Sequence, residues 1–491
     1  MAGTITEEAP SEAIGATAAR GAVWQMAGFV CLTLSSYVMV TLLARGLGPA
    51  GYAVFGIAYS AMQTSELILR LGVPQALSKL IADRTDPAPR IEATGVTTAA
   101  AIYLAGFAAF FLGAPWLAAF FNVPDAAHLF RIAAIDLPFF GLYTILAHVL
   151  IGRRDFRRSA VGTCGYGLTK AVGAVLLLAT GHLSLETAIL VNVAASLVGL
   201  ALQAGPAGAR AFLPTFEAPA ALLRLAAPIA IADIGTQLLL VADLWSLNAL
   251  GGSIPAQVKG DYLAALSLAR VPNLLAFVLI SIMVPSIARA LATDDRSAAQ
   301  GLTRGAARFL LVLVLPGCAL VAGSAGDILA LLFGEAYRGG GRYLALLIFA
   351  QGLGFTFVSA FQGILIGAGG AAEGARRVFM ALAVAIVLNL ALVPTLGATG
   401  AGLAAVLALL AAALLVGHAV RGRIGAVAEP RVVALALAGA ALVGAASWLA
   451  PGHGWLVLLE LPLLFAAWLA LAWLVRLIGR DDLALLRRKA A

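Results

Sequence analysis

Hydrophobic and polar positions follow one another along this chain in long blocks. Runs of about twenty mostly apolar residues recur from end to end, with short polar junctions between them. A helix of that length spans the hydrocarbon core of a bilayer. The pattern predicts about fourteen membrane-crossing helices, near residues 22–43, 53–81, 93–113, 129–151, 159–180, 184–204, 222–249, 261–288, 304–323, 342–367, 375–394, 398–418, 431–450 and 455–478.

The polar junctions alternate in charge. Those after even-numbered spans carry most of the basic residues, such as Arg153 and Arg154 after the fourth span, Arg304 and Arg308 after the eighth, and Arg421 after the twelfth. Junctions after odd-numbered spans are poor in Lys and Arg. Basic loops of multi-pass proteins stay in the cytoplasm. We therefore expect both termini to be cytoplasmic.

A weak internal repeat predicts two lobes. Tyr52 opens the second span and Val73 lies near its end, while Tyr262 and Val284 hold the same places in the eighth span, about 211 residues later. Six spans separate the copies, so they have the same orientation and form parallel repeats. We expect a cytoplasmic tail at 1–19, an N-lobe at 20–204, a linker at 205–220, a C-lobe at 221–422, and two further spans with a cytoplasmic C-terminus at 423–491.

Composition supports an all-α membrane protein. Hydrophobic residues make up 62% of the chain and charged residues only 11%, whereas soluble domains carry about a quarter charged residues. The net charge of +8 lies in loops that would face anionic lipid, so it does not indicate nucleic-acid binding. Cys31, Cys164 and Cys318 are far apart and the five histidines are separate. We therefore expect no metal site and no cofactor.

Three segments resemble the polysaccharide-export branch of the multidrug/oligosaccharidyl-lipid/polysaccharide (MOP) exporter superfamily. They are Leu42–Tyr52 with its continuation Leu71–Leu77, then Leu332–Tyr337, and then Leu388–Ala401. The resemblance implies a flippase that moves an undecaprenyl-diphosphate-linked oligosaccharide across the membrane by alternating access, for O-antigen, capsule or exopolysaccharide assembly, without covalent chemistry. It also implies glycosyltransferases and a polymerase as pathway partners. We expect a monomer.

Charged side chains inside the spans are the candidate site residues, because a charge at that depth is costly and implies a cavity or a partner. Gln63, Glu66 and Arg70 share one face of the second span. Lys170 lies within the fifth span and Arg270 within the eighth. We interpret these five residues as the lining of a substrate cavity whose cations hold the diphosphate. The alternative for Arg70 is a structural pair with Glu66, one turn away.

Three acids within the spans allow a second interpretation. Asp136, Asp233 and Asp243 could take up a proton or sodium ion during transport, or could be structural carboxylates. Asp233 and Asp243 also leave open a multidrug or cation antiporter of the same superfamily, although the three cations within the spans argue against it. A membrane enzyme is disfavoured because no loop exceeds about 20 residues.

Overall fold

The protein is helical throughout its described residues, which are 9–82, 89–204, 219–425, 427–449, 454–475 and 477 of the computed structural model. These residues contain no strand, and ten of their helices are long and apolar enough to cross a membrane. The all-α membrane fold is thus confirmed, while the count of fourteen stays a prediction. The predicted linker and cytoplasmic C-terminus lie largely outside these residues, as do residues 1–8 of the predicted tail, whereas residues 9–19 form the start of the first helix.

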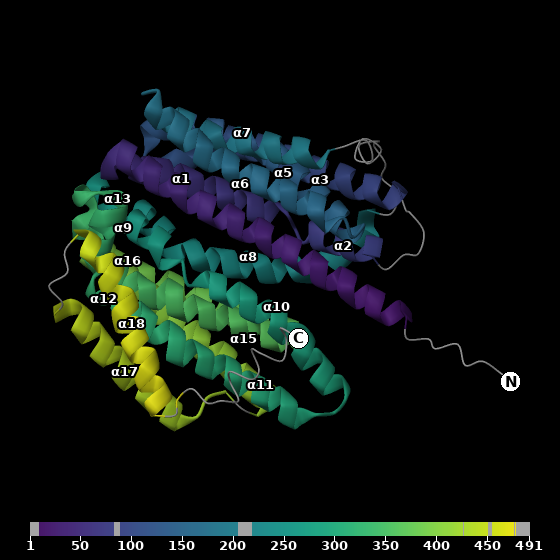
Figure 1. Ribbon diagram of the computed structural model, residues 1–491. Helices are drawn as coiled ribbons and strands as arrows, with labels where there is room; N and C mark the ends of the chain where they lie inside the picture. The colour runs from purple at the N-terminus through teal and green to yellow at the C-terminus, as the bar shows by residue number, and fades with distance from the viewer. Residues whose placement is uncertain are drawn as a thin grey trace. The chain divides into compact units, whose positions relative to one another are not determined.

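The helices follow one another in this order (Figure 1). They are α1 (Ala9–Leu69), α2 (Val73–Ala82), α3 (Pro89–Phe120), α4 (Ala127–Ala134), α5 (Asp136–Gly152), α6 (Phe156–Ala179), α7 (Leu185–Gln203), α8 (Pro219–Leu250), α9 (Ala256–Ala269), α10 (Asn273–Ala292), α11 (Arg296–Phe309), α12 (Leu315–Gly323), α13 (Ala325–Phe333), α14 (Gly341–Leu347), α15 (Phe355–Gly367), α16 (Ala371–Ile424), α17 (Pro430–Leu449) and α18 (Val457–Leu474). Short 3-10 and π-helical segments join several of them, including the π-helical η3 (Leu310–Val314).

Two of the long helices are kinked at a glycine. Gly48 in α1 has φ 66° and ψ 169°, and Gly397 in α16 has φ 61° and ψ −136°. Positive φ is accessible to glycine because it lacks a Cβ atom. The backbone at each of these glycines is not helical, so α1 and α16 each consist of two helices that meet at a kink, and the kinks coincide with the predicted breaks between spans.

The chain forms two compact units. Unit 1 comprises Met1–Leu47 and Ala58–Asp233, and unit 2 comprises Gly48–Ile57 and Ile234–Ala491. The boundaries between units fall inside α1 and α8. The predicted lobe boundaries stay a prediction.

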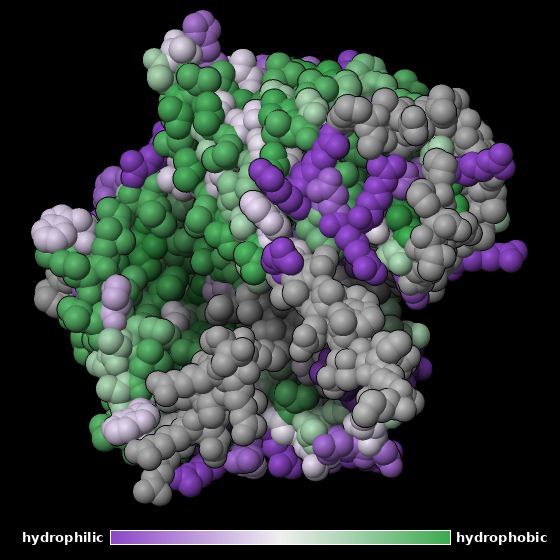
Figure 2. Space-filling model, turned by 45° about the vertical axis from the view of Figure 1, so that its right-hand side comes forward, coloured by the Kyte–Doolittle hydropathy of each residue, from purple (hydrophilic) through white to green (hydrophobic). Residues whose placement is uncertain are grey.

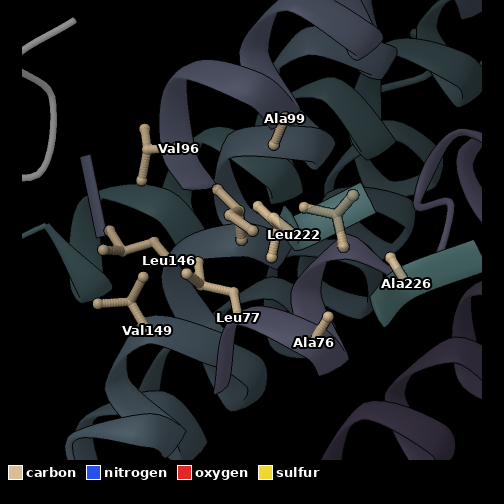
Figure 3. Close-up of a cluster of buried hydrophobic side chains, with 10 residues drawn as sticks. Ala76, Leu77, Val96, Ala99, Leu146, Val149, Leu222 and Ala226 are labelled. Atoms are coloured by element: carbon tan, nitrogen blue, oxygen red, sulfur yellow. The ribbon is translucent and has the colours of Figure 1, made fainter. Parts of the chain in front are cut away.

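An apolar cluster joins four helices of unit 1. Ala76 and Leu77 of α2 meet Val149 of α5, and Leu222 and Ala226 of α8 complete the cluster (Figure 3). Val96 and Ala99 add the face of α3. These side chains are almost completely buried. Because the first turns of α8 pack into this cluster, they belong to unit 1.

Helices α1 and α6 approach each other closely through small residues. A Cβ atom on Gly28 would lie 3.2 Å from the Cα atom of Ala160, and one on Gly167 would lie 2.7 Å from the Cα atom of Leu32. Small residues let membrane helices pack backbone to backbone. This packing holds α6, and with it Lys170, against α1 within unit 1.

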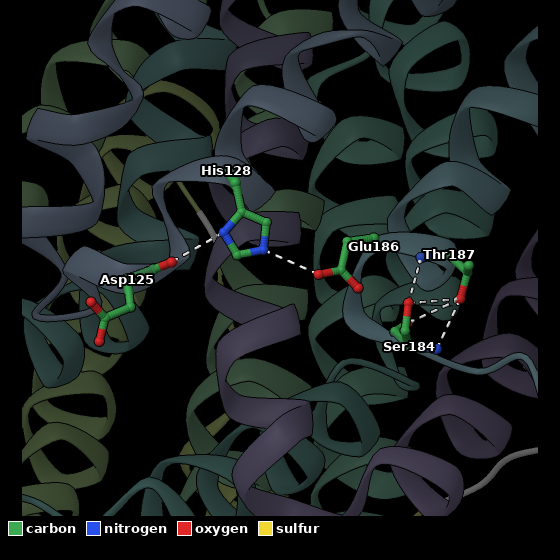
Figure 4. Close-up of polar contacts among 5 residues, drawn as sticks. All are labelled: Asp125, His128, Ser184, Glu186 and Thr187. Carbon is green, nitrogen blue, oxygen red and sulfur yellow. Dashed lines mark hydrogen bonds and ion pairs between the residues drawn. The ribbon is translucent and has the colours of Figure 1, made fainter.

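Polar contacts fix the start of α7 (Figure 4). The Ser184 hydroxyl accepts a hydrogen bond from the Thr187 amide, and the Thr187 hydroxyl accepts one from the Ser184 amide, which is a capping box. Next to it, His128 Nε2 lies 3.1 Å from Glu186 Oε1, and His128 Nδ1 lies 3.0 Å from the carbonyl oxygen of Asp125. These contacts join α4 to α7.

In unit 2 the segment Gly48–Ile57 packs against α9. The Tyr52 hydroxyl lies 3.2 Å from the Ser267 hydroxyl. Gly260 lies directly against the carbonyl group of Pro49, so closely that a Cβ atom there would overlap it. Part of the segment that resembles the MOP superfamily, Leu42–Tyr52, is therefore a tight helix-packing joint.

Large apolar side chains cover the outer faces of many helices. Examples are Leu176 on α6, Leu414 on α16, and Leu463 and Leu474 on α18, all of them exposed. Hydrophobic side chains cover wide areas of the face drawn in Figure 2, and hydrophilic ones gather in separate groups. Exposed apolar surface of this extent suits contact with lipid, as expected of a multi-pass membrane protein.

Candidate functional site

A cluster of charged side chains lies inside unit 1. Glu66 on α1, Asp136 on α5 and Lys170 on α6 are 4%, 0% and 3% exposed. Gln63 lies about one turn before Glu66 on α1, and Arg70 directly follows the last residue of that helix. Charges this deep in a membrane protein are functional candidates by default.

Aromatic groups hold the Lys170 ammonium in place. Lys170 Nζ donates a hydrogen bond to the Tyr59 hydroxyl at 3.3 Å and lies 4.2 Å from the centre of the Tyr166 ring. Gln63 Nε2 donates to the same Tyr59 hydroxyl at 3.0 Å. The Tyr166 ring in turn stacks on Tyr143, with 4.9 Å between ring centres. The cation–π contact and the hydrogen bond keep the positive charge at a defined position.

Two carboxylates share this ammonium. Glu66 and Asp136 both interact electrostatically with Lys170 and with each other. The Ser196 hydroxyl also lies near Asp136, but no group in the described part of the chain has hydrogen-bond geometry to either Asp136 oxygen. Buried polar atoms without such a partner are rare and often mark a functional group.

Arg70 lies at the edge of the cluster. Its guanidinium carbon is 5.5 Å from the centre of the Phe140 ring. Among the described residues Arg70 forms no direct ion pair with Glu66, and the two interact only at longer range. Asp233, half-buried on α8, also interacts electrostatically with Arg70. The guanidinium thus faces the Phe140 ring and also interacts with the Tyr103 side chain, while its Nε atom has no hydrogen-bond partner among the described residues.

A second polar cluster lies in unit 2. Arg270 follows the last residue of α9, and its Nη2 atom donates to the carbonyl oxygen of Leu240 at 2.8 Å. Gln351 Nε2 donates to the same carbonyl oxygen at 3.3 Å. The Tyr262 hydroxyl donates to Asp243 Oδ2 at 2.7 Å, and Asp243 interacts electrostatically with Arg270.

The structure therefore groups the predicted residues into two sets. Unit 1 holds Gln63, Glu66, Arg70, Lys170, Asp136 and Asp233, and unit 2 holds Arg270 and Asp243. That both sets line one cavity stays a prediction.

Two buried residues of α7 were missed in the sequence. Asn192 and Ser196 are both 0% exposed, four residues apart on one helix face, and α7 packs along α5, the helix that carries Asp136. Their side chains lack hydrogen-bond partners within the described residues. The sequence does contain a signal for these two residues, because they form a polar pair at helical spacing within an otherwise apolar span.

Another contact missed in the sequence joins the ends of α3 and α5. The Glu92 carboxylate accepts two hydrogen bonds from the Arg153 guanidinium, at Nε (2.6 Å) and Nη2. These hydrogen bonds raise the pKa of Arg153. Arg153 was expected to help set the topology, and in the structure it also ties two helices together.

The fold defines the class of protein: a multi-pass, all-helical membrane protein whose architecture is shared with solved transporters. The structure is similar to that of "Lipid II flippase MurJ, inward closed conformation", with a TM-score of 0.70 and 12% identity over 93% of this chain and 100% of that one. It is also similar to an inward-facing "multidrug resistance MATE family transporter of the MOP superfamily", with a TM-score of 0.62 and 16% identity over 80% and 94% of the two chains.

A third similar structure is a MOP superfamily transporter from Pyrococcus furiosus, described by the words "reverse polarity of binding pocket". Its TM-score is 0.58, with 15% identity over 83% of this chain and 95% of that one. No curated protein matches the sequence significantly. The family model described as "Polysaccharide biosynthesis protein" matches residues 18–291, more than half of the chain, and the chain belongs to this family. The predicted resemblance to polysaccharide-export proteins is confirmed at the level of this family.

Proposed function

We propose that this protein is a flippase for an undecaprenyl-diphosphate-linked oligosaccharide, working by alternating access in a bacterial inner membrane with both termini in the cytoplasm. It would serve O-antigen, capsule or exopolysaccharide assembly. Membership of the polysaccharide biosynthesis family and the fold shared with transporters support this proposal. The observation that carries it is the buried Lys170 ammonium, which together with Arg70 interacts electrostatically with Glu66 within unit 1.

The chemistry of the cluster suits a phosphorylated glycolipid. A lysine ammonium attracts phosphate as a point charge, and a guanidinium can bind phosphate through two parallel hydrogen bonds. Lys170 and Arg70 offer one of each. The Gln63 amide and the Tyr59 hydroxyl both donate and accept hydrogen bonds, which sugar hydroxyls require.

The Glu66 and Asp136 carboxylates suggest how the substrate is released. Glu66 and Asp136 already attract Lys170, so they compete with a diphosphate for the same ammonium. A conformation that brings them closer to Lys170 would bind substrate less tightly, and such differential affinity is what alternating access requires. Uptake of a proton or cation by Asp136, Asp233 or Asp243 would couple this conformational change to an ion gradient.

We further propose that the protein works as a monomer. Glycosyltransferases and a polymerase of the same pathway would be its partners.

The test is a deletion strain complemented with single variants. Deletion should cause a lipid-linked oligosaccharide to accumulate in the cytoplasmic leaflet. Arg70→Ala, Lys170→Ala and Arg270→Ala should each impair export while protein abundance stays normal. Lys79→Ala removes an exposed lysine at the end of α2 and serves as the matched control. Normal export by all three variants would remove the cationic site from the mechanism.

A multidrug or cation antiporter is the second candidate. The buried carboxylates Glu66 and Asp136 favour it, because acids bind organic cations. Overexpression that confers drug resistance, with surface glycan unchanged by deletion, would support this function over the first.

A further inference from the structure

A cleft with three arginines lies on unit 2, outside the site described above. One part, of about 150 Å³, lies between α11 and the start of α17 and is lined by Arg304, Arg308 and Glu429, among others. The other part, of about 600 Å³, lies between the start of α17 and the end of α18 and begins at Arg431. We call the two parts together the arginine cleft.

The two parts of the cleft adjoin along α17. The residues of α17 that line them are interleaved in sequence, with Val432 in the smaller part and Arg431 and Leu435 in the larger. Arg308 also donates a hydrogen bond from Nε to the carbonyl oxygen of Leu477 at 2.5 Å, which ties α11 to the end of α18. The two parts therefore lie next to each other on α17, between α11 and the end of α18.

Two glycines keep the smaller part open. Gly301 and Gly305 lie one turn apart on the face of α11 that carries Arg304 and Arg308. A Cβ atom at either glycine would meet no atom of the described residues within 4 Å. No side chain in the described part of the chain therefore fills the space at these two positions.

The cleft has a charged part and an apolar part. Arg304, Arg308 and Arg431 outnumber the single acid Glu429, which leaves a net charge of +2. Beyond Arg431 the lining is aliphatic: Ala434, Leu435, Leu474 and Val475. Leu474 and the neighbouring Trp473 are exposed on a helix that the membrane covers. Tryptophan is enriched where hydrocarbon meets head groups, so the charged part lies at head-group level.

We propose that the arginine cleft binds an anionic glycerophospholipid, with its phosphate between Arg304 and Arg431 and an acyl chain along Leu435 and Leu474. Basic pockets between membrane helices suit anionic lipid head groups, above all on the cytoplasmic side. The alternating charge of the junctions places this end of the helices on that side. The volume of the larger part lies within the range of small-molecule sites.

Native mass spectrometry of the purified full-length chain in detergent tests the proposal, with phosphatidylglycerol and phosphatidylcholine as probes. The wild-type protein should retain phosphatidylglycerol in clear preference to phosphatidylcholine. The double variant Arg304→Gln/Arg431→Gln should lower its affinity by about twenty-fivefold, because each arginine near anionic lipid contributes on the order of a factor of five. Arg308 is left unchanged because it bonds to Leu477.

The matched control is Arg296→Gln/Arg421→Gln, which removes two exposed arginines outside the cleft and should leave binding unchanged. Gly305→Leu should weaken binding by filling the cleft without changing charge, and leucine favours the helix more than glycine does. Equal retention of the two lipids by wild type would overturn the proposal. So would equal losses in both double variants, or retention of undecaprenyl phosphate without phosphatidylglycerol.

Discussion

Replacing Lys170 with methionine separates the two roles that its position allows. Methionine keeps the length and apolar stem of lysine but removes the charge. If Lys170 only neutralises Glu66 and Asp136, its loss harms stability alone. If it binds the diphosphate, its loss also abolishes export, even after stability has been restored.

The stability effect follows from burial. Lys170, Glu66 and Asp136 are each less than 5% exposed, so Lys170→Met leaves two buried carboxylates without their nearest positive charge. Removing one partner of a buried ion pair destabilises a protein by about 3–5 kcal/mol. For a unit of this size, about 1 kcal/mol corresponds to about 2–4 °C, so we expect a fall in melting temperature on the order of 10 °C.

A second substitution, Glu66→Gln, distinguishes the two possible roles of Lys170. In Lys170→Met/Glu66→Gln one buried charge of each sign is removed, and most of the lost stability should return. We measure melting temperature in detergent, protein abundance in the membrane, and lipid-linked glycan in each leaflet. Stability should recover in the double variant while export stays low. Lys79→Met, at an exposed position, should leave every measurement unchanged.

One outcome would refute the reasoning. If the double variant exports glycan at the wild-type rate, Lys170 acts only as a counter-charge and the cationic site does not bind phosphate. Full stability of the single variant would refute the electrostatic argument instead, since two uncompensated carboxylates would then carry no penalty.

Two further predictions concern packing and capping. Gly260→Ala should destabilise the protein by about 1–3 kcal/mol, because the new methyl group overlaps the Pro49 carbonyl group; Gly301→Ala, which meets open space, is the control for thermal unfolding and should be neutral or stabilising. Asp295 Oδ1 accepts a hydrogen bond from the Ala298 amide at 2.9 Å, which lowers the pKa of Asp295. Its contribution is therefore present above the ordinary pKa of about 4 and is lost as the pH falls through the lowered value. Hydrogen exchange at the Ala298 amide should show this loss of protection in wild type and no such pH dependence in Asp295→Ala.

The membrane class, the helical fold and the family could all be predicted from the chain alone. Apolar blocks of span length are a local property, and so is the helical spacing that places Gln63 and Glu66 on one face. The same logic would have found Asn192 and Ser196, had polar pairs been sought in every span. The breaks at Gly48 and Gly397 could be predicted as well, because glycine and a nearby proline interrupt the apolar pattern there.

The tertiary structure determines which charged side chains lie close together. Nothing near Lys170 in the sequence indicates Glu66 and Asp136 as neighbours, because those residues come from other helices, 104 and 34 positions away. Likewise, Tyr52 packs in unit 2 although most of α1 belongs to unit 1. Local periodicity determines which face of a helix is polar. The helix that this face meets depends on how side chains of distant segments pack together, and no single segment encodes that.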